Sequence, residues 1–277
     1  NGVSKLLIGG GGKKKGDFVN YLEIKLNKLL VSSLYFSTTK DKLVMQLQTP
    51  NAEIIGYLKY PLNKIGIQHL NNERKAIQII SKKKIIHNYL LNDTFEGTPY
   101  LLLASLEGKI GIVEHKKVTD LLLKFEREEK YALSYHPRII ELKQSLIDID
   151  LLEYIPLVQK ISRSTSNEYS LVYEHGDFTP WNIVKVDESY IPFDFEHFVE
   201  DGLEYFDLIK YYYQIGKLLK KMEGKELLIY ISEKISNKES KQIIQLFVIK
   251  EILRNKQENE DYNFEKELLN LINGYDK

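Results

Sequence analysis

Two short segments in the second half of the chain combine residue types that can do chemistry. The first, Tyr173–Asn182, reads YEHGDFTPWN and places Asn182 five positions after Asp177. The second, Ile191–Phe198, reads IPFDFEHF and places Asp194 twelve positions after Asn182. This spacing brings hard oxygen donors into the same stretch of chain as a carboxylate that can accept a proton.

Such a donor set suits the transfer of a phosphoryl group from ATP. That reaction needs Mg²⁺ to neutralise the triphosphate and an acceptor hydroxyl held in line with it. Mg²⁺ takes hard oxygen ligands, typically one or two carboxylates together with phosphate oxygens. Asn182 and Asp194 are therefore candidate metal ligands. Asp177 would face the acceptor hydroxyl and take or orient its proton, because a general base must lie within hydrogen-bond reach.

The first hundred residues are predicted to be rich in strands. Strand-like runs joined by short turn-like segments predict an antiparallel meander, with one helix before it and one after it. The expected elements are a helix over 17–30, strands over 30–36, 43–48 and 54–60, a helix over 71–80 capped by Asn71 or Asn72, and a buried strand over 100–106.

From about residue 115 the pattern is mostly helical, interrupted by a block of strands and loops over 170–195 that carries both segments. Strands followed by helices indicate an α+β fold with two lobes. We expect an N-terminal lobe over 1–105 and a C-terminal lobe over 106–277. The expected helices are 118–131, 138–147, 203–222, 225–236, 238–254 and 264–272.

Composition excludes several classes of protein. The chain has 277 residues with 39 Lys and Arg against 39 Asp and Glu, so it lacks the basic excess of a nonspecific nucleic-acid binder. The absence of cysteine removes disulfides, thiolate metal sites and cysteine nucleophiles. No apolar run reaches the length of a membrane span, and no signal peptide is visible. We expect a cytoplasmic protein with no nucleic-acid or protein partner implied.

The pattern HGDxxxxN, followed by a strand that ends in DFE, resembles the catalytic and metal loops of the aminoglycoside phosphotransferase/choline kinase superfamily. These small-molecule kinases carry HGD or HND where protein kinases carry HRD, and DF- or DW-type motifs where protein kinases carry DFG. The resemblance is specific at the two loops, and its order covers nearly the whole chain. It implies a protein-kinase-like α+β fold with a β-rich N-lobe and a mainly helical C-lobe.

The resemblance also implies roles for residues of the C-lobe. Asp177 would be the catalytic base or the residue that orients the hydroxyl, and Asn182 and Asp194 would hold Mg²⁺. His175 would brace the catalytic loop. Asp207, in EYFDLIKYY, matches an aspartate that braces the same loop from the next helix.

In the N-lobe, Lys59 of GYLKY would contact the α- and β-phosphates of ATP or GTP, and Glu73 of NNERKA would pair with it. The two are only fourteen positions apart, which leaves a short linker before the helix. The remaining nucleotide contacts are the phosphate-covering turn of Ser37, Thr38 and Thr39, which lacks the glycines of protein kinases, and the adenine-pairing backbone of Ala104, Ser105 and Leu106.

The resulting hypothesis is a Mg²⁺- and ATP-dependent phosphotransferase that acts on a hydroxyl of a small molecule. The candidate acceptors are a sugar or polyol, choline or ethanolamine, an amino acid such as homoserine, and an aminoglycoside. The alternative is a catalytically silent kinase-like nucleotide-binding or scaffold protein, which retention of Asp177, Asn182 and Asp194 argues against. A protein kinase is disfavoured because a helix is expected within about ten residues of Asp194, which leaves no room for a long activation segment.

Two features stay open at this point. The aromatic residues of Tyr211–Tyr213 fall on the helix after the metal loop, where they would form either a core-facing stripe or a cage for a quaternary ammonium group. Core packing is the favoured interpretation. Glu196 could support the metal or the substrate, or brace the loop.

Overall fold

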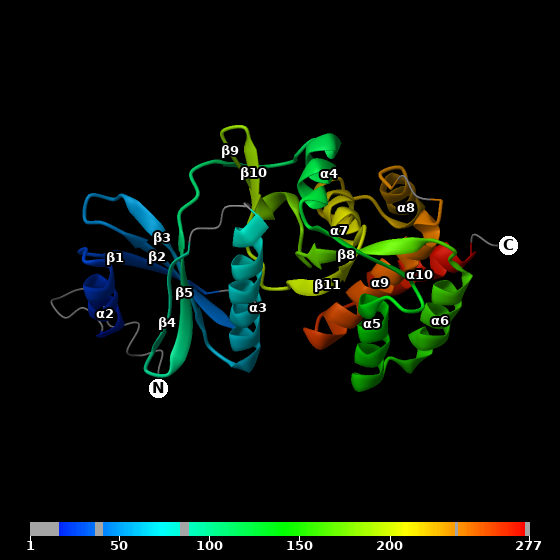
Figure 1. The fold of residues 1–277 in the computed structure, drawn as a ribbon, viewed down its shortest axis with the longest axis horizontal. Coiled ribbons are helices and arrows are strands. Elements are labelled where there is room, and N and C mark those ends of the chain that lie inside the picture. The colour runs from blue at the N-terminus through cyan, green and yellow to red at the C-terminus, as the bar shows by residue number, and fades with distance from the viewer. Residues whose placement is uncertain (1–16, 37–40, 84–88, 236–237, 275–277) are drawn as a thin grey trace. The chain divides into compact units, whose positions relative to one another are not determined.

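The computed structural model describes residues 17–36, 41–83, 89–235 and 238–274. The chain forms two compact units, Asn1–Gly108 and Lys109–Lys277 (Figure 1). Strands dominate the first unit and helices the second, which confirms the predicted α+β class. Among the described residues, no helix is long and apolar enough to cross a membrane.

The first unit is built around one five-stranded antiparallel sheet with the strand order β1-β2-β3-β5-β4. Its elements in chain order are α2 (Asp17–Leu26), β1 (Val31–Phe36), β2 (Lys42–Gln48), β3 (Ile54–Pro61), α3 (Lys64–Ile80), the 3₁₀ turn Ser81–Lys83, β4 (Tyr89–Phe95) and β5 (Thr98–Ala104). The predicted meander is present as β1, β2 and β3.

The alternation of side chains along the strands places one helix on each face of this sheet. Met45 pairs with Leu58 and Leu58 with Leu102, and this face packs against Phe18 of α2. The next residue along β3, Lys59, points to the opposite face, which α3 covers (Figure 1). The strand period therefore directs Lys59 toward α3.

Helix α3 begins earlier than predicted. The expectation of a start at Asn71 or Asn72 is wrong, because Asn63 caps the helix by accepting a hydrogen bond from the backbone N–H of Gly66 at 2.9 Å. Gly66 resembles a turn residue in the sequence, but a Cβ there would lie 2.1 Å from the carbonyl oxygen of Asp41. Close packing explains the glycine, and the helix follows β3 after two residues.

The second unit contains two three-stranded antiparallel sheets, β10-β9-β6 and β11-β8-β7, and a group of helices. Its elements are β6 (Lys109–Ile110), α4 (His115–Leu123), β7 (Glu126–Ala132), α5 (Pro137–Asp148), the 3₁₀ turn Leu152–Tyr154, α6 (Ile155–Ser164), β8 (Glu168–Glu174), the 3₁₀ turn Pro180–Asn182, β9 (Ile183–Val186), β10 (Ser189–Pro192), β11 (Val199–Leu203), α7 (Phe206–Gln214), the π-helical turn Ile215–Leu219, α8 (Gly224–Ser232), α9 (Ser240–Gln257) and α10 (Asn263–Gly274).

The prediction of a helix over 118–131 is wrong in its second half. Residues 118–131 were expected to be helical throughout, but α4 ends at Leu123 and Glu126–Ala132 forms strand β7. The segment EREEKYA is rich in helix-forming residues. Backbone pairing with β8 overrides that local preference. The side chains of β7 are all at least partly exposed, so the strand carries no buried apolar residue that would reveal it in the sequence. Sequence reasoning also missed β4 and α6.

Helix α9 crosses the centre of the second unit and packs against α5, α6, α7, α8 and α10 (Figure 1). All positions from Ile243 to Leu253 are buried, including Lys250 and Glu251. A helix that is buried all round is normally apolar. The charged residues in α9 therefore need partners inside the unit.

Phe18→Ala should lower the free energy of unfolding of the first unit by about 3–5 kcal/mol. Phe18 is 1% exposed, and its ring packs against those of Tyr60, Phe95 and Tyr100. Hydrogen exchange of β2 and β3 amides in guanidinium measures the loss. Ile24→Ala, at an 80% exposed position of the same helix, is the control and should cost less than about 0.5 kcal/mol. Equal losses would contradict docking of α2 through Phe18.

Candidate active site

The segment after β8 is held by the side chain of one residue at the start of α7. The carboxylate of Asp207 accepts hydrogen bonds from the backbone N–H of His175 at 2.7 Å and of Gly176 at 3.0 Å. Asp207 is 6% exposed, so these two bonds are shielded from water. The arrangement fixes the backbone immediately before Asp177.

The electrostatic environment of Asp207 opposes its ionisation. Burial, reinforced by the nearby carboxylate of Glu174, raises the pKa of Asp207 to about 7. The ammonium of Lys250 and the N–H groups of His175 and Gly176 act in the opposite direction without cancelling the rise. The hydrogen bonds to the loop therefore depend on a carboxyl group that is costly to keep charged.

His175 connects the catalytic loop to the segment that leads to Asp194. Its Nδ1 accepts the backbone N–H of Asp177 at 3.3 Å, so Nε2 carries the proton and donates to the carbonyl oxygen of Phe193 at 2.9 Å. Burial lowers the pKa of His175 and keeps the ring neutral. The ring therefore links the backbone of Asp177 to the backbone of Phe193.

Gly176 occupies a backbone position that excludes any other residue. Its φ of +80° lies in the left-handed region, and a Cβ would stand 2.1 Å from the carbonyl oxygen of His197. The ring of His197 lies 3.6 Å from Glu196 and 3.9 Å from Glu258. The glycine of HGD therefore allows the backbone of His197 to pack directly on the HGD segment.

Asp177 is surrounded by donors. Its Oδ2 accepts a hydrogen bond from Nδ2 of Asn182 at 3.0 Å, and its Oδ1 lies 3.2 Å from Nη1 of Arg254 and 3.5 Å from Nζ of Lys210. Burial by itself would raise the pKa of Asp177, but Lys210 and Arg254 outweigh burial and hold this pKa below its ordinary value. Asp177 is therefore ionised at neutral pH.

The β9–β10 hairpin brings the two candidate metal ligands together. Ile183 pairs with Pro192, and one step further the backbone N–H of Phe193 donates to the carbonyl oxygen of Asn182 at 3.0 Å. Asp194 follows in the left-handed region, with a φ of 67°. The hairpin register therefore places Asp194 directly after Phe193, the backbone partner of Asn182.

The donor chemistry of this pair fits Mg²⁺. Nδ2 of Asn182 donates to both the carbonyl oxygen and Oδ2 of Asp177, which turns Oδ1 of the amide away from Asp177. Asp194 adds a carboxylate. Among the described residues, no group of three or more His, Asp or Glu could hold a metal ion. A site with few protein ligands is typical of Mg²⁺ bound together with phosphates.

In the first unit, Lys59 and Glu73 form the pair that the resemblance implied. Nζ of Lys59 lies 2.8 Å from Oε1 and 2.6 Å from Oε2 of Glu73, and both side chains are buried. The short linker is accommodated because α3 starts at Lys64. The backbone N–H of Ser105 donates to the carbonyl oxygen of Ile55 at 3.2 Å, so this N–H is already used within the first unit. Ala104 ends β5 and Leu106 follows; Ser37, Thr38 and Thr39 lie outside the described residues.

The tyrosines after Asp207 are packing residues. The hydroxyl of Tyr211 accepts the backbone N–H of Val113 at 2.6 Å, and that of Tyr212 lies 2.8 Å from Nδ1 of His115. Tyr211, Tyr212 and Tyr213 are each at most 5% exposed. They do not form an open aromatic cage.

The sequence matches no protein-family model and no curated protein. Among solved structures, an ethanolamine kinase from Plasmodium vivax aligns with 98% of this chain and 92% of its own, with a TM-score of 0.60 and 12% identity. A choline kinase from Cryptosporidium parvum aligns with 99% and 92%, with a TM-score of 0.54 and 12% identity. A ternary complex of streptomycin, ATP and APH(2")-IIa aligns with 88% and 92%, with a TM-score of 0.53 and 12% identity.

The chain shares the fold of these three kinase structures. At 12% identity, this similarity shows the fold and leaves the chemistry to be argued from the side chains.

Sequence reasoning missed the cations that surround Asp177. Lys210 and Arg254 come from α7 and α9, remote from the HGD segment. The signal was a lysine three positions after Asp207 in an otherwise apolar helix, and the charged residues Lys250, Glu251 and Arg254 in VIKEILR. Each is unremarkable as a surface residue, and only packing shows that Lys210, Lys250 and Glu251 are buried.

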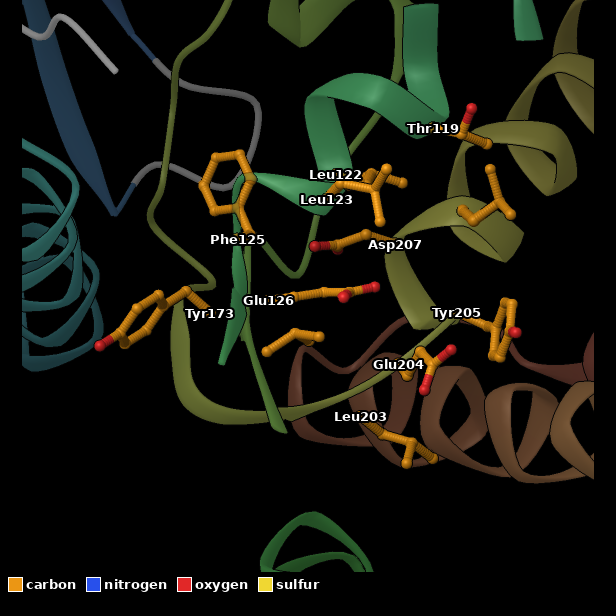
Figure 2. A pocket seen from close by; sticks show the side chains of 12 residues that line it. Thr119, Leu122, Leu123, Phe125, Glu126, Tyr173, Leu203, Glu204, Tyr205 and Asp207 are labelled. Atoms are coloured by element: carbon orange, nitrogen blue, oxygen red, sulfur yellow. The ribbon is translucent and has the colours of Figure 1, made fainter. Parts of the chain in front are cut away.

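A cavity of about 260 Å³ lies beside Asp207, which forms part of its lining. In Figure 2, Asp207 lies beside Glu126, with Leu122, Leu123 and Phe125 close by. Burial, with Glu204 as the second cause, raises the pKa of Glu126. The largely apolar lining is consistent with the raised pKa of Asp207. The residues lining the cavity are Thr119, Leu122, Leu123, Phe125, Glu126, Val172, Tyr173, Leu203, Glu204, Tyr205, Asp207 and Leu208.

Asp207→Asn tests the raised pKa of the brace. The pKa of Asp207 is about 7 in the folded chain against an ordinary value of 3.8, so the folded state binds the proton more tightly. The stabilising contribution of this proton is complete below pH 4 and is lost as the pH rises to 7. We expect the wild type's advantage in unfolding free energy over Asp207→Asn to shrink across this range.

Guanidinium unfolding followed by fluorescence is the measurement, because the single tryptophan, Trp181, lies in the catalytic loop. Asp120→Asn, at an exposed position on α4, serves as the control for the same change of side chain away from the HGD segment. An advantage of the wild type over Asp207→Asn that grows between pH 4 and pH 7 would contradict the raised pKa.

Proposed function

We propose that this chain is a Mg²⁺-dependent kinase that transfers the γ-phosphoryl group of ATP to a hydroxyl of a small molecule. The proposal rests on the hydrogen bond from Asn182 to Asp177 at 3.0 Å, and on the hairpin hydrogen bond to Asn182 from Phe193, the residue before Asp194. The fold supports it, because structures with this fold include an ethanolamine kinase, a choline kinase and a complex that contains ATP.

Lys59, oriented by Glu73, would contact the phosphates, and the backbone at Ala104, Ser105 and Leu106 would pair with adenine. In unit 2, Asn182 and Asp194 would hold Mg²⁺. When bound, the ion would neutralise charge on the phosphates.

Asp177 would position the acceptor. Its Oδ2 shares one hydrogen bond with Asn182 and can accept another from the acceptor hydroxyl. As the acceptor oxygen bonds to the γ-phosphorus, the bond from phosphorus to the β–γ bridging oxygen breaks and ADP leaves. The hydroxyl proton passes to Asp177 late in the transfer, because the low pKa of Asp177 makes it a weak base. Catalysis would rest mainly on orientation and electrostatics.

The proposed acceptors are a sugar or polyol, choline or ethanolamine, an amino acid such as homoserine, and an aminoglycoside. Burial of Tyr211–Tyr213 means that a choline site would have to use other aromatic residues. The proposal includes a cytoplasmic location, where ATP and Mg²⁺ are available to the enzyme.

Asp177→Asn should lower kcat by about 10²–10⁴-fold, because it removes the proton acceptor, and should leave ATP binding within about twofold. The measurement is a phosphotransfer screen with Mg·ATP and Mg·GTP against the acceptors named above. Asp187→Asn, at an exposed position in the β9–β10 turn, is the matched control and should behave as wild type. Nucleotide binding without transfer to any acceptor would favour a silent binding protein.

Asp194→Asn should raise the Mg²⁺ concentration needed for half-maximal transfer by at least about tenfold, because an amide is a poorer ligand than a carboxylate for a hard cation. Titration of Mg²⁺ at fixed ATP measures the shift, with Asp187→Asn again as the control. An unchanged Mg²⁺ dependence would remove Asp194 from the proposed metal site.

A further inference from the structure

Two cations from different helices converge on the same oxygen of Asp177. Nη1 of Arg254, from α9, lies 3.2 Å from Oδ1, and Nζ of Lys210, from α7, lies 3.5 Å from it. Lys210 is 2% exposed, whereas the side chain of Arg254 is 22% exposed. The oxygen Oδ1 is therefore turned toward the helices, and Oδ2 is left for Asn182 and a substrate.

Lys210 belongs to a chain of alternating charges that runs through the core of unit 2. Its Nζ lies 2.6 Å from Glu251, and the other carboxylate oxygen of Glu251 lies 3.5 Å from Nζ of Lys250. Lys250 contacts Glu174 at 3.0 Å, and Nε of Arg138, in the first turn of α5, lies 3.1 Å from the same carboxylate. Glu174 immediately precedes His175, so both ends of the chain reach the catalytic loop.

Such a chain is not needed to stabilise a core. Desolvation of buried charges offsets much of their attraction, and apolar residues of similar volume often stabilise a core equally well. A buried charge network does fix the positions of its members, because every displaced charge loses a partner. The role of this network therefore has to be sought at Asp177, its substrate-facing end.

We propose that Lys210, held by Glu251, and Arg254 are positioning residues that fix Oδ1 of Asp177, so that Oδ2 is presented to the acceptor hydroxyl. The inference rests on the proposed kinase function for its catalytic consequence. Its structural content, the immobilisation of the catalytic loop by α7 and α9, is independent of catalysis.

The decisive variant is the double substitution Lys210→Met with Glu251→Leu. It removes Lys210, one of the two cations at Asp177, without leaving an unpaired carboxylate at position 251, and Lys250 keeps Glu174 as its partner. The matched control is Lys217→Met with Glu265→Leu, which removes a 2.7 Å ion pair between the π-helical turn and α10. Neither Lys217 nor Glu265 belongs to the charge chain.

Two measurements are made on each variant of the full chain. The first is kcat and KM for Mg·ATP, with the acceptors of the screen and with water as the acceptor in ATP hydrolysis. The second is hydrogen exchange of the backbone over 175–182. For the Lys210/Glu251 variant we expect kcat to fall at least tenfold, KM for ATP to stay within twofold and exchange over 175–182 to quicken at least fivefold.

The control variant should keep wild-type kcat and wild-type exchange over 175–182. Arg254→Met should lower kcat by less than the Lys210/Glu251 variant, because water screens its partly exposed contact. A folded Lys210/Glu251 variant with wild-type kcat and wild-type exchange would overturn the inference. If wild type itself transfers phosphate to no acceptor and hydrolyses no ATP, the proposed function fails, and the exchange data alone still decide whether Lys210 fixes the loop.

Discussion

The contact between Asp207 and the two backbone N–H groups before Asp177 is the constraint on which the site depends. It uses both carboxylate oxygens of Asp207 and leaves the HGD backbone little freedom. His175 and Gly176 can then perform their separate tasks, the first bridging to Phe193 and the second allowing His197 to approach. The same burial raises the pKa of Asp207 to about 7, so its charged form is costly to maintain.

The charges of α7 and α9 extend this constraint into the interior. Burial would raise the pKa of Glu251 and of Glu174, but their cationic neighbours, led by Lys210 and Arg138 respectively, hold both below their ordinary values. The interior of unit 2 therefore contains a chain of ion pairs beside the HGD segment. Helix α9 contributes to both kinds of packing: Phe247 lies in the apolar core, and Glu251 lies in the charge chain.

This chain shares its fold with three solved structures although their sequences differ widely from its own. A few hydrogen bonds determine the geometry of the HGD segment, and many combinations of apolar residues can build a scaffold that presents it. The three related structures share only 12% of their residues with this chain, yet each aligns with at least 88% of it. Function therefore has to be argued from the loop and its neighbours.

The sequence alone determined the features that depend on local order: the α+β class from its strand-then-helix pattern, the three-stranded meander, and HGDxxxxN with Asp194 at fixed offsets. Tertiary structure decided what depends on distant partners. Pairing with β8 made Glu126–Ala132 a strand, a cap at Asn63 moved the start of α3, and packing of α7 on α9 brought Lys210 to Asp177. Periodicity and motif spacing record only interactions between near neighbours, whereas burial of a charge becomes visible once the helices that enclose it are in place.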